Sequence, residues 1–161
     1  MIGPALIERL KGQYPGAIES VHEFRGELTA IVRKADIVAV CKFLRDDPEF
    51  QFNSLKDLCG ADYARSEDRF EVVYNLYSIP FKQRLRLKVR VPEADLHCPT
   101  VTSVWSTADW HERETYDMFG IIFDGHPDLR RMYMPEEFAY HPLRKDFPLM
   151  GIPGSLPLPR K

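Results

Sequence analysis

Histidines and carboxylates crowd together between residues 108 and 148, and they are the side chains best suited to chemistry in this sequence. The stretch His111–Thr115 (HERET) resembles a zinc-binding HExxH, but Thr115 stands where the second histidine belongs, so the metal motif fails. His111, His126 and His141 recur at regular spacing. However, His126 and His141 each precede a proline, and no ligand pattern of cysteines or carboxylates accompanies them. We therefore expect no metal site.

Paired carboxylates offer a second route to chemistry. Glu112 and Glu114 could act as an acid and a base, but neighbours two apart on a helix point to different sides. The sequence also lacks a GxGxxG, a P-loop and a GxSxG motif, so nothing predicts a flavin, nicotinamide or phosphate site. We expect no cofactor in this chain and no independent catalytic activity.

The composition excludes several further classes of function. The formal net charge of −2 and the balanced charges, 29% of residues, indicate neither nucleic acid nor anionic lipid as a partner. The three cysteines form no CxxC, so a zinc ribbon or an iron–sulfur cluster cannot be built locally. With no signal peptide at the start, a reducing cytosolic setting fits best. No apolar run approaches the ~20 residues that cross a bilayer, so membrane association is expected only through partners.

A helix over 109–119 positions the densest charges. Its spacing places Arg113, Glu114 and Asp117 beside Trp110 on one side. Asp109 is expected to cap this helix, with Glu112 reaching back as in a capping box, and Gly120 is a natural C′ residue.

Basic residues farther along the chain complement this helix in sign. A tail that folds back could pin its arginines on the helix carboxylates by bidentate contacts. The sequence leaves open whether the pair Arg113 and Asp117 faces its own tail or another chain. The helix carboxylates are Asp109, Glu112, Glu114 and Asp117, and the basic residues are Arg130, Arg131, Arg144 and Lys145.

The remaining pattern predicts an α+β fold, a compact domain with a mixed or antiparallel sheet and flanking helices. Residues 70–79 are apolar on both faces, which suits a central strand covered on both sides. The expected helices cover 5–11, 34–46 and 100–105, the expected strands cover 17–24, 27–33, 70–79 and 83–91, and a short strand with turns around Cys59-Gly60 is expected within 50–63.

The strand over 83–91 has one wholly basic face, formed by Arg84, Arg86, Lys88 and Arg90. Either solvent or the acidic residues of a partner could cover that face. No aromatic side chains interleave with these cations, so a nucleic-acid surface is not expected.

The segment 120–161 holds seven of the thirteen prolines, so we place a boundary between a compact domain, 1–119, and an extended C-terminal segment. This segment is too rich in large apolar residues for a disordered linker. It is expected to pack first on its own domain and then on partner subunits, with Phe138, Tyr140 and Phe147 as apolar anchors.

These motifs resemble the signature of the 30 kDa (C) subunit family of NADH-quinone oxidoreductase, respiratory complex I. The resemblance rests on Glu112-Arg113-Glu114, Asp117-Met118-Phe119, His126, Arg130-Arg131-Met132 and the stretch PLRKDFP, which contains Arg144, Lys145 and Asp146. Looser similarity extends upstream through FLRDDPEFQFNSLKDLCGADY, VVYNLYSI and RLKVRVP.

The resemblance implies a core subunit of the peripheral arm, mainly against the D subunit and near the B subunit, beside the quinone site. FMN and iron–sulfur clusters would reside in other subunits. The assembled translocase passes electrons from NADH to quinone and couples this to proton translocation. The chain would be a peripheral protein on the cytoplasmic side of the cell inner membrane, and the signature residues together with Phe138 would form the partner interface. The alternative is the equivalent scaffold subunit of a membrane-bound hydrogenase or of an F420H2 dehydrogenase.

Overall fold

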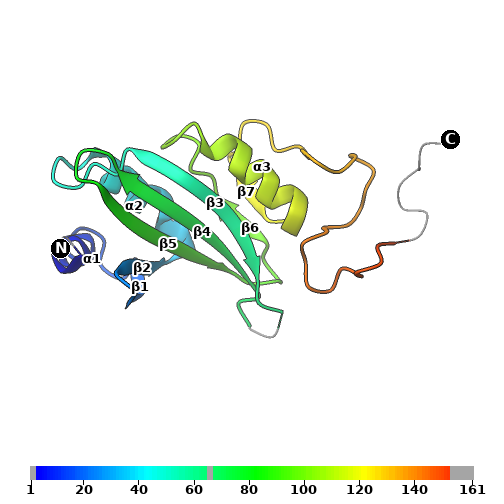
Figure 1. The fold of residues 1–161 in the computed structure, drawn as a ribbon, viewed down its shortest axis with the longest axis horizontal. Coiled ribbons are helices and arrows are strands. Elements are labelled where there is room, and N and C mark those ends of the chain that lie inside the picture. Colours follow the sequence, from blue (N-terminus) through cyan, green and yellow to red (C-terminus); the bar gives the residue numbers. More distant parts are fainter. Residues whose placement is uncertain (1–2, 65–66, 153–161) are drawn as a thin grey trace.

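The computed structural model describes residues 3–64 and 67–152. Its centre is a five-stranded sheet whose inner face is covered by helices, and a two-stranded sheet stands beside it (Figure 1). The predicted α+β fold is confirmed. The elements are α1 (Gly3–Gln13), β1 (Ile18–Phe24), β2 (Glu27–Val32), the 3-10 helix η1 (Lys34–Asp36), α2 (Ile37–Asp46), β3 (Ser54–Asp62), β4 (Phe70–Ser78), β5 (Gln83–Val91), β6 (His97–Pro99), α3 (Ala108–Phe119) and β7 (Ile122–Asp124).

The large sheet has the order β1-β2-β5-β4-β3. Its hairpins β1–β2, β3–β4 and β4–β5 are antiparallel, whereas β2 and β5 are parallel, so the sheet is mixed. The parallel pairing is short and extends only from Thr29 opposite Arg86 to Ile31 opposite Lys88. A parallel neighbour requires a crossover, and residues 33–82, which include α2, supply it.

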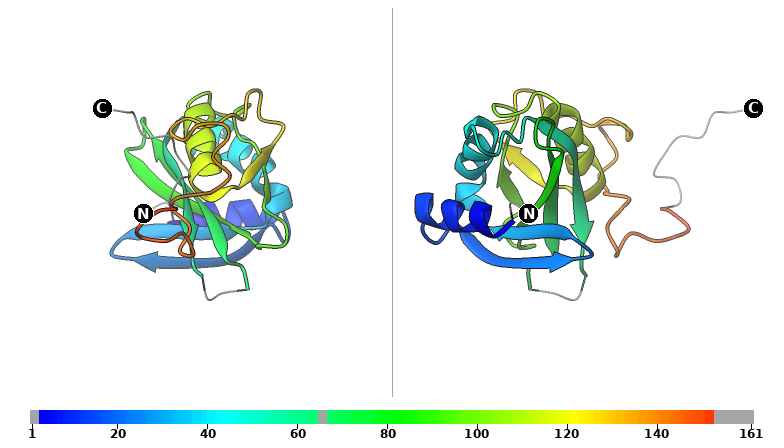
Figure 2. Two further views of the ribbon diagram at one scale, coloured as in Figure 1. Left: turned by 90° about the vertical axis from the view of Figure 1, so that its right-hand side faces the viewer. Right: turned by 60° about the vertical axis from the view of Figure 1, so that its left-hand side comes forward.

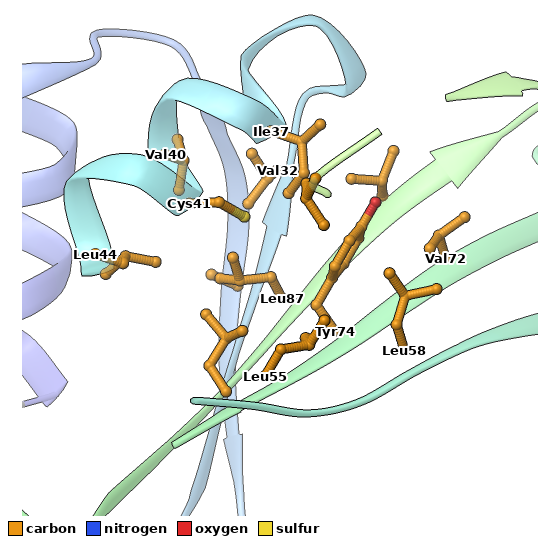
Figure 3. Packing of buried hydrophobic residues seen from close by; sticks show 14 of the residues in the cluster. Val32, Ile37, Val40, Cys41, Leu44, Leu55, Leu58, Val72, Tyr74 and Leu87 are labelled. Carbon is orange, nitrogen blue, oxygen red and sulfur yellow. The ribbon is translucent and has the colours of Figure 1, made fainter. Parts of the chain in front are cut away.

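Alternation along the strands and the helical spacing of α2 create the core. In α2, Ile37, Val40, Cys41 and Leu44 are all buried, as their i, i+3, i+4, i+7 spacing predicts. Figure 3 shows these side chains pointing toward Val32, Leu87 and Tyr74 of the sheet. The Tyr74 hydroxyl, fully buried, lies 3.5 Å from the Cys98 sulfur, so its polar end has a partner.

Three expectations about local structure were wrong. Residues 54–62 form one long strand that passes through Cys59-Gly60 without a turn. The glycine is needed there because a Cβ at Gly60 would lie 2.6 Å from the Phe119 ring of α3. Residues 100–105 form turns rather than a helix. Strand β4 is buried on one face only, since Val73 and Tyr77 on its other face stay half-exposed.

Most cations on the basic face of β5 form ion pairs with, or lie near, carboxylates of the same chain. Arg86 pairs with Glu27 at 2.7 Å, and Lys88 pairs with Glu71 at 2.8 Å. Arg90 lies 3.9 Å from carboxylate oxygens of Glu19 and Asp68. Neighbouring strands supply most of these carboxylates, which is why the strand pattern alone could not reveal them.

The chain after α3 first rejoins the core and then runs extended. Ile121 and Phe123 are buried in the core cluster, and β7 pairs in parallel with β6. The core thus extends past the boundary expected after Phe119. From residue 125 to 152 no helix or strand forms, and Figures 1 and 2 show this segment passing α3 and then running outward. We call residues 125–152 the tail.

Candidate functional site

Helix α3 buries charged residues that a surface helix normally keeps in water. Glu112 and Asp117 are fully buried, and Arg113 is 9% exposed. Charged groups are buried in proteins only where hydrogen bonds or opposite charges replace their hydration. The partners of these three side chains therefore reveal what the helix holds.

Asp117 holds residues 131–134 of the tail. Its Oδ2 accepts hydrogen bonds from the backbone N–H groups of Met132, Tyr133 and Met134 at 3.0, 2.7 and 3.0 Å. Its Oδ1 forms an ion pair with Arg131 at 2.7 Å. Burial acts to raise the pKa of Asp117, but these four donors outweigh burial and hold the pKa below its usual value. The carboxylate is a charged clamp on residues 131–134.

Arg113 binds the same stretch of tail from its carbonyl side. Its Nε donates to the Arg130 carbonyl at 3.2 Å, and its guanidinium also donates to the Arg131 carbonyl at 3.5 Å. The guanidinium stacks on Trp110, with 4.9 Å to the ring centroid. The question left open by the sequence is thereby answered, because both Arg113 and Asp117 face their own tail.

Glu112 has a structural role different from the expected capping box. The N-cap residue is Thr107, and its side chain forms no capping hydrogen bond. Glu112 instead accepts from the Thr100 hydroxyl at 2.5 Å and from the Val101 backbone N–H at 2.8 Å. Burial raises the pKa of Glu112 to about 7, despite these two donors. The side chain ties α3 to the turn that replaces the expected helix over 100–105.

His126 lies at the start of the tail with its side chain fully buried. Its Nδ1 accepts a hydrogen bond from the Asp128 backbone N–H at 3.0 Å, so the proton must be on Nε2. The Nε2 lies 3.2 Å from both the carbonyl and the carboxylate Oδ1 of Asp109, but only the carbonyl meets hydrogen-bond geometry. His126 therefore fastens the start of the tail to the first turn of α3.

A second clamp lies where β3 ends and β4 begins. Asp62 accepts two hydrogen bonds from the Arg69 guanidinium, at 3.0 and 2.9 Å, and one from the Lys145 backbone N–H at 2.7 Å. Arg69 also pairs with Glu93 at 2.6 Å and with Asp146 at 3.1 Å. Burial acts to raise the pKa of Asp62, but its donors hold the pKa below the usual value. Neither Asp62 nor Arg69 was among the predicted site residues.

Arg144 fits between the two clamps. It donates to the Phe119 carbonyl at 2.6 Å, at the end of α3, and stacks on Phe70 with 5.3 Å to the ring centroid. Gly120 ends the helix with a φ of 79°, and a Cβ there would meet Arg144 at 2.5 Å and His141 at 2.6 Å. The absence of a side chain at this residue thus allows the tail to lie close to the helix end.

The three aromatic residues expected to anchor the tail on a partner form a cluster with one another. Ring centroids of Phe138, Tyr140 and Phe147 lie 5.5 to 6.4 Å apart. Phe138 is only 4% exposed, so its ring packs within its own chain, whereas Tyr140 is 43% exposed.

Two other predicted site residues, Arg130 and Asp146, have exposed side chains. Arg130 pairs with Asp128 at 2.9 Å in an exposed ion pair, and the side chain of Asp146 is 61% exposed. Glu114 is half-buried. The structure thus brings the side chains of Arg113, Asp117 and Arg131 to one stretch of the tail, whereas Arg130 joins them only through its backbone carbonyl.

Within residues 3–64 and 67–152, no group of three or more His, Cys, Asp or Glu side chains is placed to hold a metal ion. Over the same ranges, no helix combines the length and apolar character of a membrane span.

The comparisons with known proteins agree with one another. The sequence profile of the family described as respiratory-chain NADH dehydrogenase, 30 Kd subunit, matches residues 30–153. The chain belongs to this family. The C subunit of the NADH-quinone oxidoreductase of Geotalea uraniireducens is 53% identical over 89% of this chain and 86% of its own length. The C subunit of the Roseiflexus sp. enzyme is 54% identical over 89% of this chain and 83% of its own length.

Solved structures share the fold of this 30 kDa-family chain. The trypsin-resistant fragment of Nqo5 is 31% identical, covers 80% of this chain and 100% of its own, and gives a TM-score of 0.65. A chain of the membrane-bound sulfane sulfur reductase, an archaeal respiratory membrane complex, gives a TM-score of 0.76 at 22% identity and covers 93% of this chain and 88% of its own. The second likeness concerns the fold alone.

Proposed function

We propose that this chain is a cofactor-free structural subunit of the peripheral arm of NADH-quinone oxidoreductase, without catalytic activity of its own. It lies mainly against the D subunit and near the B subunit, on the cytoplasmic side of the inner membrane. The complex it serves carries electrons from NADH to quinone and couples this transfer to proton translocation. The names of the relatives that are 47–54% identical support this machine over a hydrogenase or an F420H2 dehydrogenase.

The observation that carries the proposal is the orientation of the charged side chains of the family signature. Asp117, Arg113 and Arg131 point into the tail and into one another, with their polar atoms satisfied by backbone groups. A catalytic carboxylate needs access to a substrate, and this one has four protein donors and no exposed surface. The signature thus acts as a fastening that gives an otherwise irregular segment one conformation.

The fastened tail presents apolar side chains to the outside. Binding to a partner is stronger when the binding segment is already ordered, because less conformational entropy is lost on association. In our proposal these side chains contact the D and B subunits. The exposed large apolar residues along α3 and the tail are Trp110 at 60%, Tyr133 at 59%, Tyr140 at 43%, Leu143 at 54%, Leu149 at 105% and Met150 at 96%.

Charge substitutions on this surface test the proposal. A tagged chain carrying Leu143→Glu and Leu149→Glu should fold normally, since both side chains are exposed. The amount of D subunit that co-purifies with it should fall by about tenfold or more. The control is Val21→Glu, because Val21 is an exposed apolar side chain on β1, more than 100 residues before Leu143 in the sequence. Deleting everything after Phe119 is unsuitable because it removes Ile121 and Phe123 from the core. Equal recovery of the D subunit with both variants would refute the tail-mediated mechanism.

A further inference from the structure

The sheet opens where β2 and β5 diverge. Their parallel ladder begins at Thr29 and Arg86, and it includes neither residues 27–28 of β2 nor residues 83–85 of β5. Two adjoining hollows of about 500 and 1020 Å³ lie at this opening and share Glu27, Leu28, Tyr77 and Arg84 in their walls. We call the combined hollow the splay groove.

Positive charge gathers in the splay groove, although the whole chain carries a net charge of −2. Five cations line it against two carboxylates. The cations are Arg25, Lys56, Lys82, Arg84 and Arg86, and the carboxylates are Glu23 and Glu27. Glu27 is already paired with Arg86 at 2.7 Å, so its charge is not available to the other cations. The groove therefore has a local field opposite in sign to that of the chain as a whole.

Arg84, Lys56 and Lys82 have no carboxylate partner among the described residues. Arg86, Lys88 and Arg90 on the same basic strand face lie near carboxylates of neighbouring strands. Arg84, the fourth, forms no ion pair, and neither do Lys56 and Lys82 within residues 3–64 and 67–152. Lys56 instead lies over the Tyr77 ring at 5.1 Å.

Exposed apolar side chains flank these cations. Strand β1 ends at Phe24, which is 67% exposed, and the turn after β4 carries Ile79 and Phe81, which are 58% and 40% exposed. The turns that follow β1 and β4 border the groove through Arg25 and Lys82. Large apolar side chains mixed with arginine and bordering a concave surface are the composition typical of protein–protein contacts.

We propose that the splay groove binds an acidic segment of a partner polypeptide. Its carboxylates would neutralise Arg84, Lys56 and Lys82, and an apolar side chain beside them would cover Phe81. The alternation of β5 raised the choice between solvent and an acidic partner, and the groove is where Arg84, Lys56 and Lys82 have no carboxylate partner among the described residues. This site is separate from the tail and does not depend on how the tail binds the D subunit.

A zero-length carbodiimide reagent tests the proposal in the assembled complex, because it couples a lysine amine to a carboxylate only when the two are in contact. Mass spectrometry should find Lys56 or Lys82 joined to an aspartate or glutamate of another polypeptide. Lys56→Arg with Lys82→Arg keeps both charges and should abolish these cross-links. Coupling of the lysines only to Glu23 or Glu27 of the same chain would overturn the proposal. So would protection of both lysines from the reagent that disappears after treatment with nuclease or extraction of lipid, because the occupant would then be nucleic acid or lipid.

Charge reversal supplies a second readout. Arg84→Glu with Lys56→Glu should weaken recovery of the cross-linked partner by about tenfold, and more steeply at low salt. Arg90→Glu on the same strand is the matched control and should change recovery less than about twofold. Thermal unfolding of the isolated full chain shows whether each variant is folded. Equal recovery with folded Arg84→Glu/Lys56→Glu and Arg90→Glu chains would overturn the proposal.

Discussion

Replacing Asp117 by asparagine should release the tail while leaving the sheet and its helices folded. Asparagine removes the charge that pairs with Arg131 and offers one acceptor oxygen where the carboxylate serves four donors. Removing one partner of a buried ion pair costs about 3–5 kcal/mol. Arg131 keeps a second hydrogen bond, to the Tyr140 carbonyl at 3.2 Å, so we take the lower end, about 3 kcal/mol.

Trypsin reports this change directly. The peptide bond after Arg131 is protected on both sides, because its carbonyl accepts from Arg113 and the following N–H donates to Asp117. A loss of about 3 kcal/mol in docking raises the population of the open tail about 100-fold, and cleavage of a rapidly opening segment follows that population. The cleavage rate after Arg130 and Arg131 should rise by about the same factor.

The control is Asp128→Asn, which removes a carboxylate from an exposed ion pair of the same tail. Exposed pairs contribute little, so its cleavage rate should stay within about twofold of the parent chain. Because the pKa of Asp117 is lowered in the folded chain, its contribution is present above the ordinary aspartate pKa of about 4 and is lost as the pH falls through the folded value. Asp117→Asn should remove this acid sensitivity. Equal cleavage of the asparagine variants at 117 and 128 would refute the clamp.

Three further substitutions test the packing around α3. Glu112→Gln keeps the acceptor for Val101 and can donate to Thr100. Because the pKa of Glu112 is raised in the folded chain, its contribution to stability is complete below the unfolded pKa and is lost as the pH rises through the folded value of about 7. The free energy of unfolding of the parent chain, measured by chemical denaturation, should therefore fall by about 3 kcal/mol between about pH 4 and 7. Glu112→Gln should abolish this fall. Gly60→Ala should lower the free energy of unfolding by about 1–3 kcal/mol through overlap with the Phe119 ring, and Phe119→Leu in the same chain should recover part of it. Gly120→Ala should lower the melting temperature, since a positive φ costs about 1 kcal/mol or more and the new Cβ meets Arg144.

Local patterns predicted the parts of the fold whose cause is local. The alternation in β5 and the spacing of Ile37 and Leu44 in α2 each require one buried face, and the structure confirms both elements. The prediction for residues 54–62 was wrong because Cys59-Gly60 is typical of a turn. In the structure Gly60 instead makes room for the Phe119 ring of α3, about sixty residues later in the sequence. The purpose of such a glycine depends on a neighbour that no sequence window contains.

The sequence predicted that charged residues of the helix and the tail form the candidate site, but it did not predict most of their hydrogen-bond partners. Opposite signs on the helix and the tail indicated that they would meet, and Arg131 does pair with Asp117. Most of the donors to Asp117 are backbone N–H groups, which carry no sequence signal. The second clamp joins Asp62 to the backbone of Lys145 across 83 residues, and an ordinary Asp–Arg pair gives no hint of so distant a partner.

The clamps also fix an order of events during biosynthesis. Translation adds Asp117 before residues 131–134 and Asp62 before Lys145, so each carboxylate is synthesised before the tail groups that bind it. Until those groups arrive, α3 keeps a hydrated carboxylate where the finished chain has a dry contact. A nascent chain halted before residue 131 therefore cannot complete the outer surface, and only polypeptides synthesised through residue 145 close both clamps. Synthesis through residue 145 thereby becomes a condition for the finished surface, before any neighbouring subunit is met.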